Sequence, residues 1–310
     1  MKIKQSQLKA ILAGETPLLP WLEVARRVKE ARFGKKIETC AIVNAKSGRC
    51  PSDCHFCAQA KEWATEAKIY PLLAEEELLR QAEEAAAAGI DRFSFVTSGI
   101  SLSTTELERL LRVIETLRER VPGLVLCASL GRLSRAQLAE LKAAGLDRYH
   151  HNLETSEEFY PRICSRQLWR DRYQTILAAK EVGLSTCCGG IFGMGETDED
   201  VLSLAGALKV LEVDSVPVNF LHPIPGTPLE GVKHLTPLKA LRILIVLRLL
   251  LPGAEIRLCG GREYNLGDLQ ALSLYPASGL MVGNYLTTRG RDLAQDREMI
   301  RALGYTSGLL

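Results

Sequence analysis

TCAIVNAKSGRCPSDCHFC, residues 39–57, joins an apolar, β-branched run to a loop that holds three cysteines. The run at 39–46 has the composition of a buried strand. The loop places Cys50, Cys54 and Cys57 at the spacing C-x3-C-x2-C. Barrel enzymes built from alternating strands and helices carry their chemistry in such loops, at the carboxyl ends of the strands. We therefore expect this stretch to supply the first strand and the first active-site loop of a barrel.

The rest of the chain repeats the pattern, with helix-forming segments between short apolar runs. The segment SRAQLAELKAAG (134–145) is one such helix, with Ser134 as its N-cap and Gly145 at its end. The expected strands lie at 39–46, 92–99, 124–131, 148–154, 185–193, 215–223, 254–261 and 280–285. Strands that alternate with helices predict a parallel sheet. Eight of them predict an α/β fold, a (β/α)8 barrel of the TIM type. We expect one domain over 1–310, with N-terminal helices over about residues 1–35 beside the barrel.

Charge and hydropathy exclude several classes of partner. The 310 residues include 39 basic and 37 acidic side chains, for a formal net charge of +2. This balance does not indicate a nucleic acid or an anionic membrane as partner. The apolar run LRILIVLRLLL (241–251) is interrupted by Arg248 and is too short to span a bilayer. The N-terminal sequence has no apolar run typical of a signal peptide, so a cytoplasmic location is expected.

Nine cysteines in such a chain indicate metal or redox chemistry rather than a disulfide framework, because their number is odd and the expected compartment is reducing. A zinc site is one alternative for the loop. Zinc sites generally use paired C-x2-C elements and a fourth ligand, whereas only Cys54 and Cys57 form such a pair here. A 4Fe-4S cluster suits three cysteines better, because each thiolate binds one iron and the fourth iron stays open for a substrate or cofactor.

Other cysteines lie in the expected strands. Cys127, Cys187 and Cys259 fall in the third, fifth and seventh strands. Alternate strands of a barrel contribute side chains to the same interior layer, so these three thiols could meet around a second cluster. Arg257 shares a strand face with Cys259, because they are two residues apart. Cys188 can join Cys187 only if the strand bends, which the glycines at 189–190 permit.

The remaining two cysteines, Cys40 and Cys164, have no such neighbours in the sequence. Buried cysteine commonly acts as a small apolar side chain. We therefore expect both to be structural thiols.

Taken together, the motifs resemble biotin synthases, members of the radical S-adenosylmethionine (SAM) superfamily, whose signature is the C-x3-C-x2-C loop. The resemblance extends from about residue 42 to residue 304. It rests on VNAKSGRCPSDCHFCAQ (43–59), YHHNLETSEEFY (149–160), GGIFGMGET (189–197), SVPVNFLHPIPGTPL (215–229), IRLCGGRE (256–263) and YLTTRGRDLAQDREMIRALG (285–304). It implies insertion of sulfur into dethiobiotin, with cleavage of two SAM molecules and an auxiliary iron–sulfur cluster as sulfur donor.

The resemblance also implies ligands for both clusters. Cys50, Cys54 and Cys57 match the ligands of the SAM-binding 4Fe-4S cluster. Better-known family members hold a 2Fe-2S auxiliary cluster through three cysteines and an arginine. Three of those positions match Cys127, Cys187 and Arg257, whereas the fourth falls on Ser94, and serine is a poor ligand beside thiolate. Cys188 and Cys259 are additional. We expect a four-iron auxiliary cluster held by Cys127, Cys187, Cys188 and Cys259; a 2Fe-2S cluster with one substituted cysteine is the alternative.

Further residues match positions that bind small molecules in the family. They imply SAM contacts by Phe56, Asn152, Glu154, Arg172, Gly190 and Ile191, and dethiobiotin contacts by Asn152 and Asn219. The role of His150 stays open between a contact and a buried histidine, and His151 is expected to point the other way. For Arg172 a solvated position on a helix is the alternative.

The resemblance further implies an electron donor such as flavodoxin or ferredoxin, and a homodimer. Two other functions remain open at this point. One is a single-cluster radical SAM enzyme, such as a hydrogenase-cofactor maturase. The other is a structural protein that binds zinc or a cluster.

Overall fold

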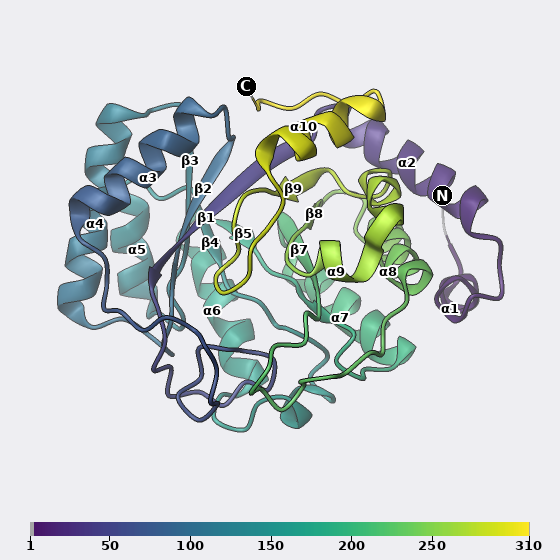
Figure 1. Cartoon of the computed structure of the whole chain (residues 1–310), viewed down its shortest axis with the longest axis horizontal. Helices are drawn as coiled ribbons and strands as arrows, with labels where there is room; N and C mark the ends of the chain where they lie inside the picture. Colours follow the sequence, from purple (N-terminus) through teal and green to yellow (C-terminus); the bar gives the residue numbers. More distant parts are fainter. Residues whose placement is uncertain (1–2, 310) are drawn as a thin grey trace.

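Parallel strands form one continuous sheet that closes into a barrel in the computed structural model, which describes residues 3–309 (Figure 1). The strands are β1 (Glu38–Lys46), β2 (Arg92–Thr97), β3 (Val125–Ser129), β4 (Arg148–His150), β5 (Ser185–Cys187), β6 (Gly190–Phe192), β7 (Ser215–Phe220), β8 (Glu255–Leu258) and β9 (Gly279–Met281). Each overlaps one of the eight expected runs, although β4 ends before residue 154 and β9 before residue 285. The predicted α/β barrel is therefore confirmed.

The nine strand segments make eight barrel strands because β5 and β6 are two halves of one strand. The chain breaks its regular pairing at 188–189, and both halves pair with β7, Cys187 with Ser215 and Gly190 with Val218. Close packing explains why glycine lies at this break. A Cβ at Gly190 would lie 2.3 Å from the backbone oxygen of Glu154. The bend expected from the glycine pair is therefore present.

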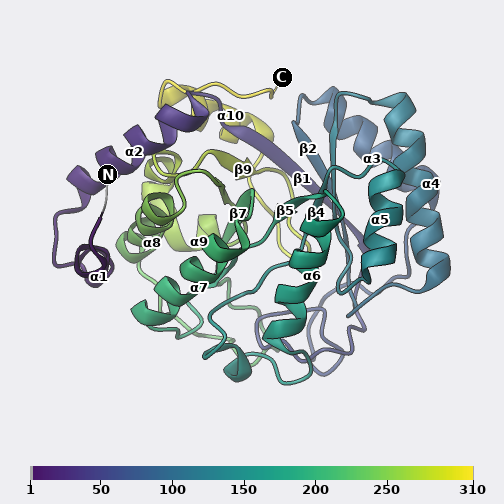
Figure 2. The same cartoon turned by 180° about the vertical axis from the view of Figure 1, so that it is seen from behind.

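Helices surround the barrel (Figures 1 and 2). They are α1 (Gln5–Ala13), α2 (Leu18–Phe33), α3 (Glu75–Ala87), α4 (Thr104–Arg120), α5 (Arg135–Ala143), α6 (Trp169–Glu181), α7 (Asp198–Leu211), α8 (Pro237–Leu250), α9 (Arg262–Leu266) and α10 (Leu293–Ala302), with 3-10 turns at Tyr160–Arg162 and Gly267–Leu274. Ser134 accepts a hydrogen bond from the Gln137 amide at the start of α5, which confirms it as N-cap.

The apolar run of the sequence forms α8, which is buried along most of its length and packs against α1, α2 and α7. Its Arg248 is fully buried and donates hydrogen bonds of 2.8 Å to the backbone oxygens of Pro276 and Ala254. A buried guanidinium is tolerated here because carbonyl oxygens surround it. Across residues 3–309, none of the helices is both long enough and apolar enough to cross a membrane.

The close approach at the strand break leads to a stability prediction. Replacing Gly190 with alanine forces a Cβ against the Glu154 backbone, so we expect Gly190→Ala to lower the free energy of unfolding by about 2 kcal/mol or more. The matched control is Gly206→Ala on the exposed face of α7, where a Cβ meets open space and should raise stability by up to about 1 kcal/mol. Urea unfolding of the two proteins would measure this; equal effects would contradict the explanation.

Candidate active site

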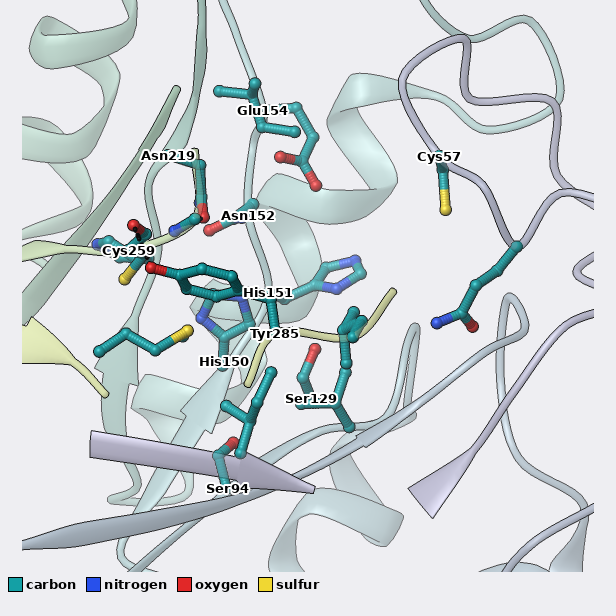
Figure 3. A pocket seen from close by; sticks show the side chains of 18 of the residues that line it. Cys57, Ser94, Ser129, His150, His151, Asn152, Glu154, Asn219, Cys259 and Tyr285 are labelled. Carbon is teal, nitrogen blue, oxygen red and sulfur yellow. Dashed lines mark hydrogen bonds between the residues drawn. The ribbon is translucent and has the colours of Figure 1, made fainter. Parts of the chain in front are cut away.

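A cavity of about 380 Å³ opens at the carboxyl ends of the strands and extends into the barrel. Its lining comes from nearly all barrel strands and from the three-cysteine loop (Figure 3). In this view Cys57 and Cys259 lie on opposite sides, with Asn152 and Glu154 between them. The position agrees with the rule that barrel enzymes place their sites at this end.

The three-cysteine loop closes one side of the cavity. Cys50, Cys54, Cys57 and the intervening Phe56 all line it. The loop is anchored by the Asp53 carboxylate, which accepts hydrogen bonds from the backbone amides of Ser165 and Arg166 (both 3.1 Å). The structure therefore brings the four residues of this loop together at one cavity.

Cys164 lies next to this loop, which the sequence analysis did not foresee. Its Sγ is 3.7 Å from the Sγ of Cys54, and the Ser52 hydroxyl lies between 3.4 and 3.5 Å from both sulfur atoms. A hydrogen bond between the two thiols raises the pKa of Cys54 and lowers the pKa of Cys164. No sequence signal links the two cysteines, because they are brought together by the segment after β4.

A buried polar cluster lies between the loop and the barrel. Arg172 on α6 donates to the Tyr160 hydroxyl (2.7 Å), to the backbone oxygen of Asn152 (3.0 Å) and to Glu154 Oε1 (3.4 Å). The alternative of a solvated helix arginine is therefore wrong. Glu154 has a φ of +70°, a strained conformation for this residue type that is typical of functional sites. Burial raises the pKa of Glu154, although the charge of Arg172 opposes this effect.

Two atoms of this cluster are buried without a hydrogen-bond partner among the described residues, Glu154 Oε2 and His151 Nε2. Such atoms are costly unless a ligand or water satisfies them. His151 lines the cavity, so the expectation that it points the other way is wrong. The reason is that β4 ends at His150, and the alternation of a strand does not extend beyond it. His150 Nδ1 lies 3.3 Å from the Sγ of Cys187.

The side chains of the two predicted asparagines line the cavity, and some of their polar atoms form hydrogen bonds with the barrel backbone. Asn152 Oδ1 accepts from the amide of Gly189 (3.1 Å). Asn219 Oδ1 accepts from the amide of Gly260 (3.0 Å), and its Nδ2 donates to the oxygen of Gly190 (3.3 Å). The Asn152 amide NH2 group stays available to a ligand. Ile191 adds an apolar surface to the lining, whereas Gly190 lies behind it in the strand.

The barrel interior below the cavity follows from the strand registers. The pairs are Cys40 with Arg92, Cys127 with Arg148, Arg148 with Ser185, Cys187 with Ser215, Ser215 with Glu255, Arg257 with Gly279, and Glu38 with Gly279. Arg92 in turn pairs with Val125. In such a barrel the register advances two residues for every two strands. From Cys40, the pairs lead across two strands to Val125, and two residues further along the chain is Cys127. Repeating this step leads from Cys127 to Cys187, then to Arg257, and finally back to Cys40.

These four residues therefore form one layer, and all of them line the cavity. Cys259 follows Arg257 by two residues and lines the cavity nearer its mouth. Among the described residues no three His, Cys, Asp or Glu side chains are placed to hold a single metal ion. An iron–sulfur cluster differs, because its thiolates bind separate irons and need not converge on one point.

Comparison with known proteins identifies the family. The pattern of the Radical SAM superfamily matches residues 44–208, and that of the Biotin and Thiamin Synthesis associated domain matches residues 217–306. The chain is 44% identical over 301 residues to a biotin synthase of a Sulfurihydrogenibium species, covering 97% of this chain and 90% of the relative. It is 49% identical over 288 residues to a biotin synthase of Desulforudis audaxviator, covering 93% and 87%. The chain belongs to the biotin synthase family.

Members of this family are radical SAM sulfurtransferases, so the chain is an enzyme of that class, with a 4Fe-4S cluster and SAM as cofactors. Solved structures show the same fold. Methylornithine synthase matches with a TM-score of 0.85 at 22% identity, over 99% of this chain and 94% of that one. The FeFe-hydrogenase maturase of Carboxydothermus hydrogenoformans matches with a TM-score of 0.83 at 19% identity, over 99% and 76%. At these identities the likeness concerns the fold alone.

Two cysteines of this biotin synthase family member lie where the sequence analysis did not expect them. Cys188, predicted as a cluster ligand, is fully buried in the main apolar core and does not line the cavity. The bend after Cys187 is real, but it leaves Cys188 on the outer side of the barrel wall. Cys40, predicted to be only structural, lies in the layer of Cys127 and Cys187.

Charged side chains close the barrel beneath this layer. Glu255 accepts a hydrogen bond from Arg148 (2.6 Å) and ion-pairs with Arg92 and Arg257 (both 3.1 Å). Burial alone would raise the pKa of Glu255, but the three arginines lower it from 4.5 to about 2. Three guanidinium groups thus share two carboxylates, Glu38 and Glu255, which leaves an excess positive charge below the thiols.

This network leads to a pH prediction. A carboxyl group whose pKa is lowered on folding stabilises the protein above its unfolded pKa and loses that contribution as the pH falls through its folded pKa. We expect stability to fall from about pH 4.5 toward pH 2, and Glu255→Gln to make this fall shallower. At pH 7 the same change should cost about 3 kcal/mol, because it leaves buried arginines underpaired.

The matched control is Glu157→Gln, since Glu157 pairs with Arg170 at the surface. It should change stability by less than about 1 kcal/mol at any pH. Urea unfolding as a function of pH measures both variants. Identical pH slopes for Glu255→Gln and the natural chain would contradict the assignment.

Proposed function

We propose that this enzyme inserts sulfur into dethiobiotin to form biotin, with SAM and dethiobiotin in the cavity and an auxiliary iron–sulfur cluster in the barrel below. The observation that carries the proposal is that two separate sets of cysteines line the same cavity. Cys50, Cys54 and Cys57 close its mouth, and Cys127 and Cys187 lie in the layer at its floor. Membership of the biotin synthase family supports the choice of substrate.

The residues present fit the cofactors that the family implies. The three loop thiols line the cavity, and so does Glu154, whose buried Oε2 has no hydrogen-bond partner among the described residues. When bound, the four-iron cluster supplies the electron that cleaves SAM, and the auxiliary cluster supplies sulfur. The protein's own contribution is position and exclusion of water, because a radical reacts with any nearby hydrogen donor.

Individual residues then have the following roles. Glu154 and Asn152 bind SAM from the segment after β4, and Phe56 and Ile191 shape the surface that receives it; Gly190 lies behind this surface, against the Glu154 backbone. Arg172 holds the Glu154 carboxylate and the Asn152 backbone in place. Asn219 is held in place by a hydrogen bond from the Gly260 amide. Its side chain forms further hydrogen bonds to dethiobiotin, together with Asn152.

We further propose that the chain acts as one unit over 1–310, as a cytoplasmic homodimer that receives electrons from flavodoxin or ferredoxin. Support for these proposals comes from the family resemblance. Light scattering after size exclusion measures the oligomeric state, and SAM cleavage with each reduced donor tests the electron source.

Iron analysis and Mössbauer spectra of the anaerobically reconstituted enzyme test the auxiliary cluster. About eight irons per chain are expected for two four-iron clusters. About six would mean a two-iron sulfur donor. About four would remove the donor and, with it, the proposed sulfur insertion.

The loop cysteines give a prediction for turnover. Cys54→Ala removes one ligand of the SAM-binding cluster, so formation of 5′-deoxyadenosine should fall at least about 1,000-fold. The control is Cys188→Ala, which changes a core thiol outside the cavity and should keep most of the activity. Both are measured by chromatography of anaerobic assays with dithionite. Deoxyadenosine formation that survives Cys54→Ala would exclude radical SAM chemistry at this loop.

The unpartnered oxygen of Glu154 gives a prediction for binding. Glu154→Gln keeps the shape of the side chain but removes the charge, so we expect SAM affinity to fall about 10-fold, as for one lost charge-assisted hydrogen bond. Equilibrium dialysis with labelled SAM measures it on reconstituted enzyme. Glu157→Gln, at the surface, should bind SAM unchanged. Equal affinities for both variants would remove Glu154 from the SAM site.

A further inference from the structure

Cys40 occupies a place in the barrel that neither the family match nor the sequence pattern assigns to a ligand. Closure of the registers puts it in one layer with Cys127, Cys187 and Arg257. It is buried, faces the cavity and comes from the first barrel strand, whereas Cys127 and Cys187 come from the third and fifth. Three of the four positions in this layer are therefore thiols on alternate strands.

The fourth position of the layer is occupied by an arginine that is already fully engaged. Arg257 lies flat across β9, where a Cβ at Gly279 would be 2.9 Å from its guanidinium carbon. It then reaches β1 and donates to the Glu38 backbone oxygen (3.2 Å), and it pairs with the carboxylates of Glu38 (3.5 Å) and Glu255 (3.1 Å). The resemblance implies an arginine ligand at this position, but in this chain Glu38 and Glu255 hold the guanidinium in its protonated form, which has no free electron pair to offer to iron.

Cys259 supplies the missing thiol. It lies two residues beyond Arg257, just past the end of β8. Its side chain lines the cavity, and its backbone amide is fixed by the oxygen of Val218 (2.9 Å). Its Sγ lies 3.5 Å from the backbone oxygen of Arg257, and both Cys259 and Cys40 line the same cavity as Arg257.

We propose that Cys40, Cys127, Cys187 and Cys259 are the four ligands of the auxiliary cluster, with Arg257 as a charge partner below it rather than a ligand. This inference rests on the proposed function and specifies its sulfur-donor site. Four thiolates, from or just beyond the odd-numbered barrel strands, line the cavity, three in one layer and Cys259 two residues further along its chain segment, which is the number that a four-iron cluster requires. The excess positive charge of Arg92, Arg148 and Arg257 over Glu38 and Glu255 stabilises the anionic cluster.

Two other residues are excluded from the ligand set by their positions. Cys188 faces the apolar core on the other side of the barrel wall. Ser94 lines the cavity between the Cys40 and Cys127 strands, but it carries a hydroxyl, which binds iron less well than thiolate. Both serve as matched controls, because both are small: Ser94 lies on β2, next to the Cys40 strand, and Cys188 directly follows Cys187.

The experiment uses the full chain with Cys50, Cys54 and Cys57 all changed to alanine, so that only the auxiliary cluster binds iron. After anaerobic reconstitution with ferrous iron and sulfide, iron and sulfide per chain are measured, with Mössbauer spectra and with electron paramagnetic resonance of the dithionite-reduced protein. About four irons per chain are expected in this background. Circular dichroism and thermal unfolding of each variant check its fold.

Adding Cys40→Ala or Cys40→Ser should at least halve the bound iron, or convert its spectrum to that of a three-iron cluster. Adding Cys188→Ala or Ser94→Ala should leave iron and spectrum unchanged. Cys40→Ser nearly preserves the side-chain volume, so a loss seen in both Cys40 variants does not come from a packing defect. Unchanged iron and spectrum in both Cys40 variants, or a loss with Cys188→Ala or Ser94→Ala in their place, would overturn the assignment.

Cys127→Ala separates this inference from the proposed function. Iron lost with Cys127→Ala but kept with Cys40→Ala would leave the sulfur donor in place and reject only Cys40 as its ligand. A background that binds no iron would reject the auxiliary cluster itself and therefore both proposals.

Discussion

Closure of the parallel barrel determines which side chains of this enzyme can meet. In a closed sheet every strand has two neighbours, so the register of each pair is constrained by all the others. The two-residue advance for every two strands brings Cys40, Cys127, Cys187 and Arg257 into one layer, although they are separated by up to 217 residues in the chain. A slip of one residue in any strand would turn its inward side chains to the helices. The deep part of the site therefore depends on barrel closure as a whole.

Buried ion pairs between residues of different strands lie at the bottom of the closed barrel. Arg92, Arg148 and Arg257 would each be costly in an apolar interior, but Glu38 and Glu255 hold them in place. The network lies at the lower end of the barrel and leaves an excess positive charge beneath the thiols. The anionic cluster that we propose for this position would compensate the charge that the carboxylates leave. The same ion pairs thus hold the buried arginines in place and set the charge beneath the thiols.

The mouth of the cavity is built differently, from loops and irregular backbone. The three-cysteine loop is anchored by Asp53 on the segment after β4, and the same segment brings Cys164 against Cys54. Glu154 keeps a strained backbone conformation and a buried, unpartnered oxygen. Strain and unsatisfied polar atoms are expected where a ligand completes the structure. The enzyme therefore combines a floor held together by ion pairs with an upper rim that is completed by its ligands.

The sequence by itself determined the strands, the helices between them, the helix cap at Ser134 and the loop of Cys50, Cys54 and Cys57. These features depend on local composition and spacing, which short stretches of chain already contain. The tertiary structure alone decided the positions of Cys40, Cys188, Cys164 and His151. For Cys187 and Cys188 the sequence shows two adjacent thiols and a bend, but which of them faces the interior depends on pairing with β4 and β7. Cys40 has no cysteine near it in the sequence, and it joins the other thiols only because the register closes around the whole barrel. Local composition specifies each element, whereas the meeting of side chains from distant strands requires all the pairings at once.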